Sequence, residues 1–202
     1  MTDLLTRRAV VAGMGVLGLG MLAGCSPARG LEFKYGKNMS NEILGRSFKL
    51  KDTQGNVRTL SSYYGSMPMF FFGFTQCPMV CPTTLARAAQ IKKLMGRDAG
   101  FLQVVFITLD PERDTPEQLK TYLDYFDAGF IGLTGPLDDI QTLANAAGVP
   151  FIPGDTSKEN YTVDHGGNLA LIGPDGQLRG FIRAPMRTQK LAEQLPMVLA
   201  LE

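Results

Sequence analysis

Two cysteines and one histidine are the side chains of this sequence with the clearest capacity for chemistry. Cys77 and Cys81 stand four positions apart, and His165 is the single histidine among the 202 residues. Thiolates attack disulfides and bind soft metals. Two thiolates and one imidazole form a soft three-coordinate set, which suits Cu(I). Zinc usually takes a fourth protein ligand or water, and iron–sulfur clusters usually need four ligands.

The spacing of the cysteines is compatible with more than one use of the pair. Four residues place the two sulfurs about one helical turn apart, which is close enough for a disulfide or a shared ion. In an exported protein such a pair is a structural disulfide, a redox couple or a metal site. Its position between a strand and a helix favours a functional role, because α/β folds place their sites there.

The elements on either side of the cysteines must hold them at the start of a helix. Residues 69–72 (MFFF) read as a strand buried on both faces, and residues 82–95 read as a helix that stops at Gly96. The partial positive charge of a helix N-terminus favours the thiolate form. We expect His165 on a loop, where Gly166 and Gly167 permit a close approach of backbone or ion. Asp164 reads as a turn residue rather than as a partner that orients the imidazole.

The remaining pattern predicts an α/β layer fold, with parallel crossovers first and an antiparallel pair later. Thr115 and Gln118 form a capping box around a proline at the first helical position. The other expected elements are a hairpin turning at 54–56, a strand at 104–107, a helix ending at Gly148, a hairpin of 169–172 with 178–182, and a segment 188–199 interrupted by Pro196.

The N-terminal residues predict export. Arg7 and Arg8 precede an uncharged apolar run that ends at Cys25 and is shorter than the roughly 20 residues of a spanning helix. Residues 22–25 (LAGC) resemble the lipobox of bacterial lipoproteins, in which the cysteine is lipidated. We therefore expect a signal peptide at 1–24, a flexible tether at 25–42 and one folded domain at 43–202, anchored by lipid on Cys25 in the periplasm or outside the cell.

Composition excludes several function classes. The chain is 45% hydrophobic with a formal charge of +1, which indicates a folded protein and argues against broad binding of nucleic acid. A single histidine rules out an ordinary Cys2His2 zinc site, and any Ser-His-Asp hydrolase would have to use His165.

Four segments resemble the Sco/SenC family. They occur in the family's order at 72–84 (FGFTQCPMVCPTT), 108–116 (TLDPERDTP), 130–135 (FIGLTG) and 163–165 (VDH). The resemblance extends over about 45–183 and implies a thioredoxin-like fold, with a central mixed sheet flanked by helices and an N-terminal β-hairpin extension. It also implies one copper ion bound by Cys77, Cys81 and His165. One departure is Met79, because the family usually carries an acidic residue between the cysteines.

The function that the resemblance implies is that of a metallochaperone, not an enzyme. It would assist assembly of the dinuclear copper centre in cytochrome c oxidase subunit II, with a periplasmic copper donor as a further partner. The alternative is a thiol–disulfide oxidoreductase, in which Cys77 and Cys81 reduce the cysteines of the same subunit and His165 is dispensable. A peroxidase on this fold would need a threonine three residues before its reactive cysteine, where this chain has Phe74.

Overall fold

The computed structural model describes residues 48–157, 161–182 and 188–199. The chain divides into two compact units, Met1–Leu31 and Glu32–Glu202, and all described residues belong to the second. The predicted signal peptide, the tether and Cys25 lie outside the described residues, so the domain limits at 24/25 and 42/43 stay predictions.

A seven-stranded mixed sheet forms the centre of the second unit, with the order β2-β1-β5-β4-β3-β8-β9. Strand β3 pairs in parallel with β4, and β4 in parallel with β5, so the two crossovers carry helices as parallel strands require. Strands β1 and β8 join this parallel centre in antiparallel fashion. The strands are β1 (Leu50–Asp52), β2 (Val57–Arg58), β3 (Met67–Gly73), β4 (Leu102–Thr108), β5 (Ile131–Thr134), β8 (Leu169–Ile172) and β9 (Leu178–Ile182).

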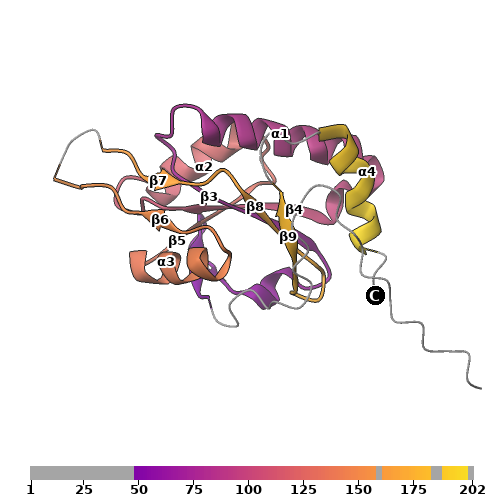
Figure 1. Ribbon diagram of the computed structural model, residues 1–202, viewed down its shortest axis with the longest axis horizontal. Helices are drawn as coiled ribbons and strands as arrows, with labels where there is room; N and C mark the ends of the chain where they lie inside the picture. Colours follow the sequence, from indigo (N-terminus) through magenta and orange to yellow (C-terminus); the bar gives the residue numbers. More distant parts are fainter. Residues whose placement is uncertain (1–47, 158–160, 183–187, 200–202) are drawn as a thin grey trace, which may run out of the picture. The chain divides into compact units, whose positions relative to one another are not determined.

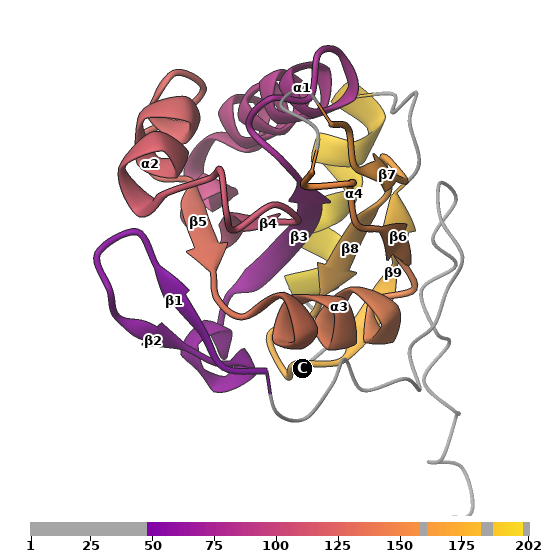
Figure 2. The ribbon, with the colours of Figure 1, turned by 90° about the vertical axis from the view of Figure 1, so that its left-hand side faces the viewer.

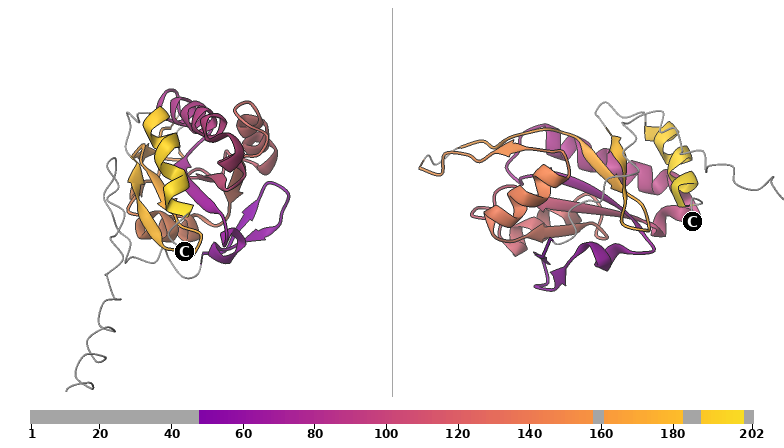
Figure 3. Two further views of the ribbon diagram at one scale, coloured as in Figure 1. Left: turned by 90° about the vertical axis from the view of Figure 1, so that its right-hand side faces the viewer. Right: turned by 60° about the horizontal axis from the view of Figure 1, so that its bottom comes forward.

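Helices cover both faces of this sheet. Figure 2 shows α1 (Val80–Met95) and α2 (Pro116–Asp124) above the sheet and α3 (Leu137–Ala146) below it. Helix α4 (Thr188–Leu199) lies against α1 (Figure 3). Side chains alternate along the central strands, so Phe70 and Phe72 join the core under α3 while Phe71 packs against Phe106 on the opposite face. Short 3-10 helices occupy Leu60–Tyr63 and Gly96–Gly100.

A separate two-stranded sheet carries the histidine. Strands β6 (Phe151–Ile152) and β7 (Asp164–His165) pair antiparallel, with Phe151 opposite His165. Figure 1 shows residues 153–157 and 161–163, which follow β6 and precede β7, reaching beyond the end of the main sheet. We call the described residues 151–157 and 161–165 the arm. His165 therefore lies on this arm and not on a strand of the main sheet.

The predicted fold class is confirmed, as a thioredoxin-like α/β architecture with an N-terminal hairpin. The hairpin β8–β9 has the predicted bounds, and Thr115 and Gln118 form the expected capping box. Helix α1 begins at Val80 rather than at Pro82, so Cys81 is inside the helix. The expectation that His165 lies on a loop is wrong, since it ends strand β7. Helix α4 runs through Pro196 as one element.

Candidate metal centre

The structure brings the two cysteines and the histidine together at the carboxyl end of β3. Cys77 lies in the turn between β3 and α1, Cys81 is the second residue of α1, and His165 ends β7. The Cys81 Sγ and the His165 Nε2 are 3.7 Å apart although 84 residues separate them. The ligand atoms of all three residues lie within 4.8 Å of one another, the one such group of three or more metal-binding side chains in the described part of the chain.

The two thiols are free and occupy different environments. Cys81 is fully buried, whereas Cys77 is half-buried. The Cys81 backbone N–H donates to the Cys77 Sγ at 3.4 Å, so the helix N-terminus presents a donor to that sulfur. Burial, and then the neighbouring Cys77, raise the pKa of the Cys81 thiol. Desolvation therefore outweighs the helix N-terminus at Cys81, contrary to the expectation that both thiols favour the thiolate.

Close packing fixes the position of Cys81. A Cβ added to Gly73 would stand 2.5 Å from the Cys81 Sγ and 3.0 Å from the Phe106 ring. Only a glycine at the end of β3 leaves room for the sulfur to rest on the strand. A Cβ on Gly167 would come within 2.9 Å of the Val80 side chain, so the close neighbour of this glycine is a side chain and not the backbone or ion that we expected.

The imidazole is oriented by a backbone carbonyl. The His165 Nδ1 lies 3.1 Å from the carbonyl oxygen of Gly166. A carbonyl only accepts, so Nδ1 carries the hydrogen and Nε2 keeps its lone pair on the side of Cys81. Phe74 packs edge-on against the ring, with centroids 5.6 Å apart. Asp164 is exposed, as expected of a residue that does not orient the imidazole.

A buried carboxylate supports the turn that holds Cys77. Asp114 accepts the backbone N–H of Thr75 at 3.0 Å and its hydroxyl at 2.5 Å. Its second oxygen also accepts the hydroxyl of Thr108 at 2.6 Å, at the end of β4. Burial raises the pKa of Asp114, and the hydrogen bonds from Thr108 and Thr75 act in the opposite direction. The loop 110–115 thus does more than cap α2, because it ties the cysteine turn to the neighbouring strand.

The surface around the centre is partly apolar. Met79, between the cysteines, is 72% exposed and Val80 is 41% exposed. A methionine side chain that is this exposed does not seal the two sulfurs from solvent. A shallow pocket of about 310 Å³ next to the imidazole is lined by 150–152 and 164–166.

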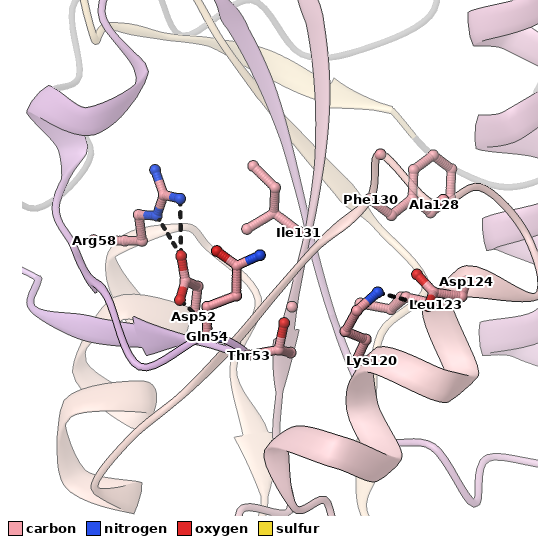
Figure 4. A pocket seen from close by; sticks show the side chains of 12 residues that line it. Asp52, Thr53, Gln54, Arg58, Lys120, Leu123, Asp124, Ala128, Phe130 and Ile131 are labelled. Carbon is pink, nitrogen blue, oxygen red and sulfur yellow. Dashed lines mark hydrogen bonds and ion pairs between the residues drawn. The ribbon is translucent and has the colours of Figure 1, made fainter.

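A second pocket, shown in Figure 4, contains none of the three candidate ligands. It has a volume of about 170 Å³ and lies between the β1–β2 hairpin and the end of α2. Its charged groups neutralise each other, since Arg58 pairs with Asp52 at 2.8 Å and Lys120 with Asp124 at 2.6 Å. With its charges already paired, this pocket offers no reactive group.

The helices of the described segments include none that is both long and apolar enough to span a bilayer.

A thioredoxin-like fold with two cysteines and a histidine at the end of β3 defines a class of thiol and metal-binding proteins. Within that class, residues 36–200 match the SCO1/SenC family, and the chain belongs to it. A Stutzerimonas stutzeri protein to which copper binding has been attributed is 52% identical over 152 residues, which cover 75% of this chain and 74% of that protein.

Two solved structures complete the comparison. Copper-bound ScoI of Bradyrhizobium japonicum is 32% identical with a TM-score of 0.69, and the match covers 81% of this chain and 99% of ScoI. BsSco, a member of the Sco family of cytochrome c oxidase assembly proteins, is 19% identical with a TM-score of 0.65, covering 83% and 98% of the two chains. At that identity BsSco supports the fold alone.

Proposed function

We propose that this chain is a copper metallochaperone that binds one copper ion through Cys77, Cys81 and His165 and assists assembly of the copper centre of cytochrome c oxidase. The observation that carries the proposal is the convergence of two sulfurs and one imidazole nitrogen within 4.8 Å. Soft thiolates select Cu(I), and three donors suffice for that ion. Copper would be the ion that is delivered, and the chain supplies the three ligand atoms and fixes their orientation.

The supporting geometry is that of a preformed site. The Gly166 carbonyl fixes the imidazole tautomer, and Gly73 gives the Cys81 sulfur its place on β3. A metal-binding histidine usually donates its second ring N–H to such an acceptor, which orients the imidazole. Family membership and the copper-bound relative point to the same ion.

The direct test is a copper titration of the reduced full-length chain against a chromophoric Cu(I) chelator. We expect one equivalent to be retained, and the Cu(II) form to show a sulfur-to-copper charge-transfer band. Cys77→Ser and Cys81→Ser should abolish retention, and His165→Ala should weaken it. Cys25→Ser is the matched control, because it removes the third thiol of the sequence without touching the cluster. Equal retention by all variants would exclude the assigned ligands.

The alternative role is reduction of the cysteines of the target subunit. Two free thiols, one of them half-exposed, provide the dithiol that it requires. Complementation in a strain lacking the gene separates the two roles. If His165→Ala restores oxidase assembly while Cys77→Ser does not, the chain acts as a reductase. If both variants fail, metal binding is required.

The location and the partner complete the proposal. The N-terminal pattern supports a signal peptide at 1–24, lipid attachment at Cys25 and a domain held at the membrane in the periplasm or outside the cell. The family resemblance supports subunit II of the oxidase as the recipient. Metabolic labelling with a radioactive fatty acid tests the anchor, and Cys25→Ser should lose the label.

A further inference from the structure

One guanidinium joins the separate segments that surround the metal centre. Arg113 lies in the loop between β4 and α2, and none of its atoms belongs to the candidate ligand set. Its Nη1 donates to Gln76 Oε1 at 3.1 Å, directly before Cys77. Its Nη2 donates to the carbonyl oxygen of Tyr161 at 3.0 Å, on the arm that carries His165. Its Nε bonds the buried Asp110 carboxylate, which holds the guanidinium in place.

The contact with Tyr161 is the most extensive of these. The Arg113 guanidinium also stacks on the Tyr161 ring, 3.5 Å from its centroid. A cation–π attraction is therefore added to the hydrogen bond to the Tyr161 carbonyl. The Tyr161 hydroxyl donates to Asp110 at 2.6 Å. Burial and this hydrogen bond raise the pKa of Tyr161 to about 12, so the donor stays protonated at neutral pH. The Gly154 backbone packs directly against the Tyr161 ring, because a Cβ at Gly154 would stand 2.0 Å from that ring.

A second route runs through aromatic packing. Arg113 lies 5.9 Å from the centroid of Phe74, and Phe74 packs against the His165 ring. The guanidinium is therefore linked to His165 indirectly, through Tyr161 on the same arm and through the Phe74 ring. Because β6 and β7 contribute two residues each, the arm has little backbone pairing of its own to fix the imidazole.

We infer that Arg113 is a positioning residue for His165, which locks the arm to the β4–α2 loop through Tyr161 and so sets how closely the imidazole approaches the two sulfurs. This rests on the proposed copper site. It predicts an effect of Arg113 that operates through the histidine and not through the thiols. Lysine is not an adequate substitute, because one ammonium cannot make the three diverging bonds and the stacked contact of the planar fork.

The first test measures the arm without metal. In the reduced, metal-free full chain, Arg113→Gln should speed amide hydrogen exchange of 161–167 by about tenfold or more, while exchange in β3 changes less than about twofold. Arg113→Lys should behave as the glutamine variant does. Arg58→Gln is the matched control, since it breaks another ion pair with a buried aspartate, in the β1–β2 hairpin. Unchanged exchange at 161–167 would overturn the inference.

The second test is a double-mutant cycle on Cu(I) affinity with His165→Ala. Arg113→Gln should weaken binding by about tenfold when His165 is present and by less than about twofold when it is absent. Equal losses in both backgrounds would overturn the positioning role. If the parent chain binds no copper, the proposed function fails, while the exchange experiment still decides the role of Arg113. Should Arg113→Gln fail to fold, Tyr161→Leu removes the stacked ring and is judged by the same two criteria.

Discussion

Asp114 accepts hydrogen bonds from both donors of Thr75, the backbone N–H at 3.0 Å and the hydroxyl at 2.5 Å, across 39 residues of sequence. Thr75 stands two positions before Cys77, so the turn that presents the sulfur is supported by a carboxylate from the β4–α2 loop. The carboxylate is buried, and the bonds that satisfy it are the bonds that shape the site.

Asp114 makes stability depend on pH. Burial raises its pKa in the folded chain above the ordinary 3.8, so the folded state keeps a proton that the unfolded state loses. The contribution of Asp114 to stability, taken as the parent chain minus the Asp114→Asn variant, should therefore fall as pH rises from about 3.8 through the raised pKa, and then level off. Asp114→Asn removes this component. Urea unfolding of both chains between about pH 3.5 and 7 checks it, and a parent chain that gains on the variant with rising pH would contradict it.

Gly73 allows Cys81 to rest on β3. Gly73→Ala should cost about 1–3 kcal/mol of unfolding free energy, because its Cβ would stand 2.5 Å from the sulfur. Gly100→Ala is the control, since a Cβ there meets nothing within 4 Å. Chemical denaturation measures both. Equal effects of the two alanines would mean that the Cys81 sulfur is not confined by the strand.

Copper affinity should rise with pH. Burial raises the pKa of the Cys81 thiol, whereas the metal binds the thiolate, so uptake releases at least one proton near neutral pH. The apparent Cu(I) affinity should increase about tenfold per pH unit for each proton released. Competition titrations at about pH 6.5, 7.5 and 8.5 measure the slope. His165→Ala should keep the thiol contribution to it, and a flat profile would mean that Cys81 is not a ligand.

Two tyrosine hydroxyls should respond in opposite ways to removal. The Tyr63 hydroxyl is buried with no hydrogen-bond partner among the described residues, so Tyr63→Phe should leave stability unchanged or raise it by up to about 1 kcal/mol. The Tyr161 hydroxyl donates to the Asp110 carboxylate, so Tyr161→Phe should cost about 1.5–3 kcal/mol. Thermal unfolding measures the stability of both variants. A larger loss of stability in Tyr63→Phe than in Tyr161→Phe would contradict the prediction.

Local signals in the sequence explain which elements could be predicted. Thr115 with Gln118 and the glycine-rich turn at 173–176 act over a few residues, and the elements they delimit appear where expected. Strand β5 has no such signal, because Gly132 interrupts its short apolar run. Strands β6 and β7 are shorter still and pair across a long excursion, so neither has a readable period.

The residues of the candidate site also fall into those with a local sequence signal and those that depend on long-range contacts. Cys77 and Cys81 could be recognised from their own spacing, and His165 from its rarity, but their meeting depends on a fold that brings together residues 84 positions apart. Arg113 and Tyr161 were not singled out, since their contact depends on the arm folding back onto the β4–α2 loop. The family motif at 108–116 includes Arg113, which was the one signal that could have pointed to it.

The candidate ligands lie on backbone elements of unequal length, which has a consequence for the release of a bound ion. Cys81 belongs to a sixteen-residue helix, whereas His165 ends a two-residue strand. In the proposed copper site, the imidazole would therefore be the donor that detaches first, while both sulfurs would keep the ion bound. We would then expect copper to pass to an acceptor protein within a complex of the two proteins, rather than through copper ions free in solution.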